Sequence, residues 1–154
     1  MALKPMRFPY FRLNTNKPVW PLGGRLDRPK PIISVSLTGP GGTAARDSLL
    51  DTGADDTVFP ERVAAAIGVD LTNAPIGEAK SAAGVVVPVR YAFVTLRVTD
   101  GHESRTRSAW VGFAPPPFKG PLLGFAGFLQ FFGAYFDGER EEVELTVNGL
   151  YPGI

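Results

Sequence analysis

A pair of leucines, Leu49 and Leu50, leads directly into Asp51-Thr52-Gly53, and Ala54-Asp55-Asp56 follows. Asp, Thr and Gly favour a tight loop at the end of an apolar strand. The short polar side chains bond to nearby backbone groups, and Gly adopts conformations that other residues avoid. The triplet occurs once in 154 residues, and the chain shows no internal repeat. One copy of the chain therefore offers one such loop, which carries three carboxylates.

The composition favours short strands joined by turns. Gly and Pro are abundant, at 18 and 15 residues, and both interrupt helices and mark turns. Apolar residues make up 44% of the chain, which is enough for a buried core in one domain of this length. Helices do not alternate regularly with strands, which argues against a parallel-sheet nucleotide-binding fold. We therefore predict a mainly β domain.

Several kinds of site are disfavoured by what the sequence lacks. It has no cysteine and a single histidine, His102, so disulfides, thiolate zinc sites and multi-histidine metal centres are excluded. We expect no metal and no cofactor. No apolar run reaches the length that crosses a membrane, and residues 1–7 lack the apolar core of a signal peptide. These features predict a cytoplasmic protein with no membrane partner.

Charge divides the chain into two parts. Residues 1–31 hold seven Lys and Arg against one acid, a net charge of +6, whereas residues 32–154 hold nine against fourteen, a net charge of −5. Six prolines scatter the basic residues of the first part, so we interpret residues 1–31 as an extended Pro-rich arm and expect no nucleic-acid binding. A mobile tail is the simplest interpretation. The alternative is an arm that docks on the acidic body of its own chain or of a partner.

Residues 32–150 form the predicted domain. Alternating apolar residues and turn signals predict strands over residues 32–37, 44–50, 80–98 (as a pair or one long bent strand), 105–113, 134–136 and 143–147. A helix is predicted over residues 60–68, where Pro60 begins it and Gly68 ends it. The Phe-rich stretch 125–132 predicts a second short helix. Asp100-Gly101 and Asp137-Gly138 are typical hairpin turns.

The stretch Asp51 to Val58, together with Leu122-Leu123-Gly124 some seventy residues later, resembles the two signatures of retroviral aspartic proteases (retropepsins). The order of the predicted elements is similar over residues 30 to 147. The resemblance implies a closed, barrel-like β fold with two short helices. It also implies an aspartic endopeptidase. Because such an enzyme needs two facing aspartates, a chain with one Asp-Thr-Gly is expected to act as a homodimer.

The resemblance assigns roles to the loop residues. Asp51 of each subunit would activate a water, Thr52 would hydrogen-bond across the dimer, and Gly53 would let the substrate backbone approach. Ala54, Asp55 and Asp56 would contact a peptide or protein substrate that is apolar at the cut. The tip of a flap would close over it, formed by Ala82, Ala83, Gly84 and Val85. Ala54 stands where pepsin-like enzymes have a hydroxyl residue, which predicts activity at mildly acidic to near-neutral pH.

The sequence departs from the retroviral pattern at two points. Phe125 stands where those enzymes have an Arg that pairs with the acid matching Asp55, and the flap has one glycine, Gly84. Asp55 and Asp56 are also compatible with a solvated loop cap, and Gly84 with a β-bulge. Two alternative functions stay open: a non-catalytic dimerisation or peptide-binding domain of this fold, and an enzyme that residues 1–31 inhibit until they are removed.

Overall fold

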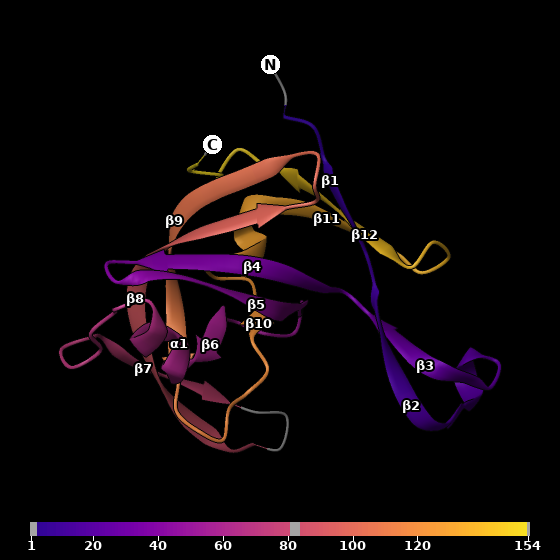
Figure 1. The fold of residues 1–154 in the computed structure, drawn as a ribbon, viewed down its shortest axis with the longest axis horizontal. Coiled ribbons are helices and arrows are strands. Elements are labelled where there is room, and N and C mark those ends of the chain that lie inside the picture. The colour runs from indigo at the N-terminus through magenta and orange to yellow at the C-terminus, as the bar shows by residue number, and fades with distance from the viewer. Residues whose placement is uncertain (1–2, 81–83, 154) are drawn as a thin grey trace.

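A closed barrel of six strands forms the body of the computed structural model, which describes residues 3–80 and 84–153 (Figure 1). The strands lie in the order β4-β5-β10-β6-β9-β8, and a pairing between β4 and β8 closes the ring. Their bounds are β4 Ile32–Gly39, β5 Gly42–Leu50, β6 Val58–Pro60, β8 Val86–Thr99, β9 Ser104–Ala114 and β10 Leu122–Leu123. The mainly β prediction and the predicted acid-protease architecture are thus confirmed.

Apolar side chains at alternate positions of these strands fill the interior of the barrel. Side chains at every second position point to the same face of a strand, and Val35 and Leu37 of β4 are fully buried together with Leu96 of β8 and Val111 of β9. Helix α1 (Glu61–Ala66) adds Val63 to the same core. It begins directly after Pro60, as the sequence predicts. Its six residues are shorter than any membrane span, and no helix in the described part of the chain is long and apolar enough to cross a bilayer.

A hairpin made by β7 (Ile76–Lys80) and the start of β8 extends from the barrel. Its strands pair from Ile76↔Arg90 to Lys80↔Val86. The strand predicted to begin at residue 80 is wrong at its start, because β7 ends there. Gly77 weakens the sequence signal for this strand, because glycine is rare inside strands. A Cβ atom at this position would lie 2.7 Å from the Tyr91 ring, so packing rather than propensity selects glycine.

The predicted helix over residues 125–132 is wrong. Only a single 3-10 turn, η2 (Leu129–Phe131), forms there. Gly127 has a left-handed φ of +91°, which breaks a helix, and a Cβ atom there would lie 2.5 Å from the Trp110 carbonyl oxygen. The backbone of Ala126 is also bonded to the Asp51 loop, through its N–H and its carbonyl oxygen. The apolar spacing that suggests a helix instead places Phe128 in the core.

A three-stranded sheet beside the barrel joins the two ends of the chain. The predicted final hairpin is present as β11 (Phe132–Asp137) and β12 (Glu142–Val147), and β1 (Met6–Pro9) pairs with β12. Met6 and Phe8 of β1 are buried in the same core as the barrel residues. The interpretation of residues 1–31 as a mobile tail is therefore wrong for this segment. The remainder forms a separate hairpin, β2 (Phe11–Val19) and β3 (Arg25–Lys30), with the 3-10 turn η1 (Trp20–Leu22) between the strands (Figure 1).

Met6→Ala should test the burial of β1. The side chain is 1% exposed, and truncation of a buried Met typically costs about 2–5 kcal/mol. We expect a loss of this size in the free energy of unfolding, measured by urea denaturation at fixed protein concentration. Leu3→Ala is the control, because Leu3 is 43% exposed and its truncation should cost less than about 0.5 kcal/mol. Equal, small losses in both variants would mean that β1 does not belong to the core.

Candidate active site

Asp51 lies at the end of β5 in a loop that folds back on its carboxylate. The Asp51 N–H donates to the Leu123 carbonyl oxygen at 3.1 Å, which ties the residue to β10. Its Oδ1 atom accepts the Gly53 N–H at 2.9 Å, and its carbonyl oxygen accepts the Ala54 N–H at 3.1 Å. Asp51 is half-buried, whereas Thr52 and Gly53 are exposed. The carboxylate is therefore held by the backbone in a partly solvent-exposed loop at the end of β5.

Strand β10 lies between the two strands that flank this loop. Leu122 and Leu123 run parallel to Leu49 and Leu50 of β5, and Leu122 also pairs with Val58 of β6. The chain leaving β10 continues along the loop. Phe125 N–H donates to the Ala54 carbonyl oxygen at 3.0 Å, and Ala126 N–H donates to that of Asp55 at 2.8 Å. The two signatures identified in the sequence thus form one hydrogen-bonded unit.

Gly124 permits this close approach. A Cβ atom at this position would collide with the Asp56 carbonyl oxygen and would lie 2.6 Å from that of Ala54. Because both neighbours are backbone atoms of the loop, no rotamer change can relieve the overlap. The glycine of Leu122-Leu123-Gly124 is therefore required by the path of the Asp51 loop.

The two acids after Ala54 have different surroundings. Asp56 is half-buried, and its Oδ2 atom accepts the Tyr91 hydroxyl at 2.7 Å. Burial, reinforced by this hydrogen bond, raises the pKa of Tyr91 to about 12, so the phenol remains a donor from acidic to neutral pH. Asp55 is exposed, and within residues 3–80 and 84–153 its carboxylate has no ion pair or hydrogen bond. Phe125, at the position of the expected Arg, is exposed to solvent.

Two of the residues predicted for a flap, Gly84 and Val85, lie between β7 and β8. Gly84 has a left-handed φ of +81° with open space around it, which identifies a turn glycine rather than one in a bulged strand. Val85 and Val86 are exposed. Ala82 and Ala83, also predicted at the tip, lie outside the described residues.

A comparison with protein families identifies the family of the chain. The model of a family described as aspartyl protease matches residues 34–125, a range that includes the Asp51 loop, the β7–β8 hairpin and β10. The chain belongs to the aspartyl protease family. No curated protein matches the chain.

A hollow of about 390 Å³ in this aspartyl protease adjoins the loop at Asp56. Phe93 and Trp110 line it, with ring centroids 5.6 Å apart, and both side chains are exposed. Tyr91 lines it as well and orients the Asp56 carboxylate. These aromatic residues are not among the site residues predicted from the sequence. Tyr91 and Phe93 stand at alternate positions of a predicted strand, so the sequence does indicate that their side chains lie on the same face. No residue close to them in the sequence indicates that this face adjoins the Asp51 loop.

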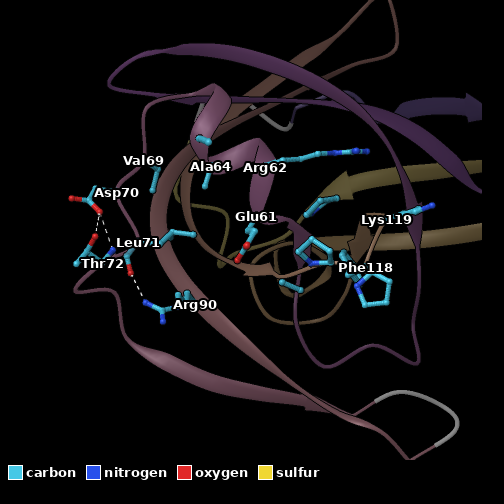
Figure 2. Close-up of a pocket in the computed structure, with 15 residues that line it drawn as sticks. Glu61, Arg62, Ala64, Val69, Asp70, Leu71, Thr72, Arg90, Phe118 and Lys119 are labelled. Atoms are coloured by element: carbon cyan, nitrogen blue, oxygen red, sulfur yellow. Dashed lines mark hydrogen bonds between the residues drawn. The ribbon is translucent and has the colours of Figure 1, made fainter.

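A second hollow, of about 610 Å³, lies between α1 and the loop that carries Phe118 and Lys119 (Figure 2). Arg90 donates to the Leu71 carbonyl oxygen at 2.9 Å on its far side, and Asp70 accepts the Thr72 hydroxyl at 2.6 Å. These bonds hold the segment after α1 in place. The carboxylates in its wall are Glu61 and Asp70, and Asp51 does not line it, so this hollow is separate from the Asp51 loop.

The described part of the chain contains no cluster of three or more His, Cys, Asp or Glu side chains placed to hold a metal ion. The groups available at the loop are carboxylates, a hydroxyl and backbone amides. One chain supplies one half-buried Asp-Thr-Gly carboxylate, in a loop whose Thr52 and Gly53 are exposed. Acid–base catalysis by a pair of such carboxylates would therefore need a second copy of the loop.

Gly124→Ala should displace the Asp51 loop. The added methyl group has backbone atoms as neighbours, so we expect a loss of about 1–3 kcal/mol in the free energy of unfolding. Gly120→Ala is a matched control on the other side of β10, because a Cβ atom at Gly120 meets nothing within 4 Å. Urea denaturation monitored by tryptophan fluorescence measures both. If the two variants are equally stable, Gly124 is not packed against the loop.

Proposed function

We propose that this aspartyl protease is an endopeptidase of the retropepsin type that acts as a homodimer, with one Asp51 from each subunit. The observation that carries the proposal is the single Asp-Thr-Gly loop, which hydrogen bonds to β10 hold in place at the end of β5. One loop supplies half of the carboxylate pair that this chemistry needs. A symmetric dimer would bring the second half to the two-fold axis.

The proposed reaction uses the two carboxylates as one acid–base unit. Two carboxylates about 3 Å apart cannot both ionise cheaply, so they share one proton. The ionised group takes a proton from a water bound between them, and the protonated group donates to the carbonyl oxygen of the peptide. The water attacks the carbonyl carbon and a neutral gem-diol forms. No acyl-enzyme, metal or cofactor takes part in this scheme.

The neighbouring residues have proposed roles in positioning. The Thr52 hydroxyls bond across the dimer and keep the two loops coplanar, while Gly53 leaves room for the substrate backbone. Asp56, which Tyr91 orients, and Asp55 contact the substrate at the ends of the cleft. The β7–β8 hairpin closes over an extended peptide and excludes water. The substrates are peptides or proteins with apolar side chains at the cut.

Asp51→Asn separates this function from a binding role. Wild type and variant are incubated with a diverse peptide mixture between about pH 4 and pH 7.5, and the products are identified by mass spectrometry. We expect the wild type to cut mostly between apolar residues and the variant to lose at least about a hundredfold in rate, because it lacks the acid–base pair. The variant should still bind peptides. Peptide binding without cleavage by either protein would instead indicate a non-catalytic domain of this fold.

The pH profile gives a second test. Ala54 has no hydroxyl group to stabilise the ionised carboxylate pair, so we expect maximal activity at mildly acidic to near-neutral pH. Ala54→Ser would add a donor, and hydrogen bonds to a charged carboxylate favour its ionised form. The variant should therefore lose activity at lower pH than the wild type as the pH rises. A wild-type maximum near pH 2, or an unchanged profile in Ala54→Ser, would contradict this role for Ala54.

A further inference from the structure

The β2–β3 hairpin is a part of the molecule that the proposed reaction does not use. It projects from the body in Figure 1 as a two-stranded sheet of its own. Met6 and Phe8 of the preceding β1 belong to the hydrophobic core of the body. Val19 of β2 is buried, but within the described residues no side chain of β2, η1 or β3 packs in the hydrophobic clusters of the body. The hairpin is therefore not folded against the barrel by apolar packing.

Large apolar side chains of this hairpin face solvent. Trp20 is 79% exposed, Leu26 57% and Phe11 50%, and Leu13 and Leu22 are exposed as well. An isolated two-stranded hairpin is marginally stable in water, and a group of exposed apolar residues typically marks an interaction surface. This pattern calls for a partner that covers the hairpin.

Ion pairs between the hairpin and Glu141, in the turn between β11 and β12, fix its direction. Arg25 forms a two-pronged contact with the Glu141 carboxylate, with Nη1 at 2.5 Å from Oε2 and Nη2 at 3.2 Å from Oε1. Arg12 of the facing strand lies 3.2 Å from the same carboxylate. Bidentate Arg–carboxylate pairs constrain orientation as well as distance. The hairpin is therefore held at a defined angle to the body.

The hairpin also joins the body beside the catalytic loop. Pro31 follows β3 directly, and its carbonyl oxygen accepts the N–H of Leu50, the residue before Asp51, at 2.9 Å. Ile32 then pairs with Leu49. The hairpin thus starts from the part of the surface where the proposed dimer must bring two Asp51 residues together.

We propose that the β2–β3 hairpin is a clasp that packs on a second copy of this chain. The inference rests on the proposed homodimer and identifies a surface that holds it. Continuity with the Asp51 face is the first argument. The second is charge, because residues 1–31 carry +6 and residues 32–154 carry −5. Arg12 and Arg25 are paired with Glu141 of their own chain, but within the described residues Lys17, Arg28 and Lys30 of the hairpin form no ion pair. In a symmetric dimer the hairpin of each subunit would pack on the other subunit. The same contact would therefore occur twice, and the assembly would stop at two copies.

The dimensions fit this role. The six residues of β3, along which β2 pairs, extend over about 20 Å at about 3.3 Å per residue. A domain of this length has a radius of gyration of roughly 15 Å. The hairpin can therefore reach over part of a second copy while its base stays near the two-fold axis.

The strand edges favour packing through side chains over addition of further strands. Pro18 lies in β2 and Pro29 in β3, and proline cannot donate to a neighbouring strand. Lys17 and Arg28 add charge, which also protects exposed edges from pairing. Open-ended strand addition is thus disfavoured, whereas the apolar side chains are available for a closed dimer contact.

The test is the dimer dissociation constant of the full-length chain, measured by analytical ultracentrifugation. The double variant Trp20→Ser, Leu26→Ser removes two exposed apolar side chains of the hairpin. We expect the constant to rise roughly tenfold or more, as it does when central apolar contacts of an interface are truncated. Leu150→Ser is the control, because Leu150 is 66% exposed but lies outside the hairpin. Removal of residues 1–28 is unsuitable, since it also removes Met6 and Phe8 from the core.

Assembly is measured in the wild type and in Asp51→Asn, so it does not depend on cleavage. A weakened dimer in the double variant, with full activity per dimer restored at high concentration, supports the clasp. A weakened dimer without peptide cleavage by any protein also supports it, but contradicts the protease function. An unchanged dissociation constant overturns the clasp, as does a wild type that stays monomeric. Higher activity at an unchanged dissociation constant overturns it too, and would mean that the hairpin obstructs the cleft.

Discussion

The hydrogen bonds between the β10 segment and the Asp51 loop are the interaction on which the rest of the site depends. Asp51 N–H donates to the Leu123 carbonyl oxygen, and Ala54 and Asp55 accept from the two residues after Gly124. These contacts join segments some seventy residues apart, so folding must close a long loop to make them. Backbone atoms form all of them. The position of the carboxylate is therefore insensitive to side-chain identity in this segment, except at Gly124, where a Cβ atom would collide with the loop. This explains why Phe125 is tolerated at the position of an expected Arg.

Local signals in the sequence were sufficient for much of the fold. The alternating strands β4 and β5, the helix after Pro60 and the Asp-Gly turns were predicted, because each depends on residues close together in the chain. The failures arose where distant contacts override local preference. The Phe-rich stretch has helical spacing, but its backbone bonds to the Asp51 loop and Gly127 turns left-handed. Gly77 weakens the strand signal of β7 because the Tyr91 ring occupies the space of its side chain.

The candidate site shows the same division. The Asp51 loop and Leu122-Leu123-Gly124 were visible because both motifs are short and contiguous. Tyr91 was not, because its bond to Asp56 joins residues 35 positions apart and depends on the register of β8 against β9. Phe93 and Trp110 meet through the same register. Strand pairing decides which outward-facing aromatic residues border the loop. The amino-acid composition does not contain that information.

The N-terminal segment shows how one charge pattern can cover two different physical roles. Its excess of basic residues was evident in the sequence, but burial divides it: Met6 and Phe8 complete the core, whereas Trp20 and Leu26 face solvent. Pro31 lies at the end of the second part and bonds to the residue before Asp51. In the proposed dimer, force on the hairpin would therefore reach β5 directly, one residue from the carboxylate. Binding of the partner and alignment of the two aspartates would then be coupled through a short, hydrogen-bonded path, so that a loosely held dimer would also be a poorly aligned one.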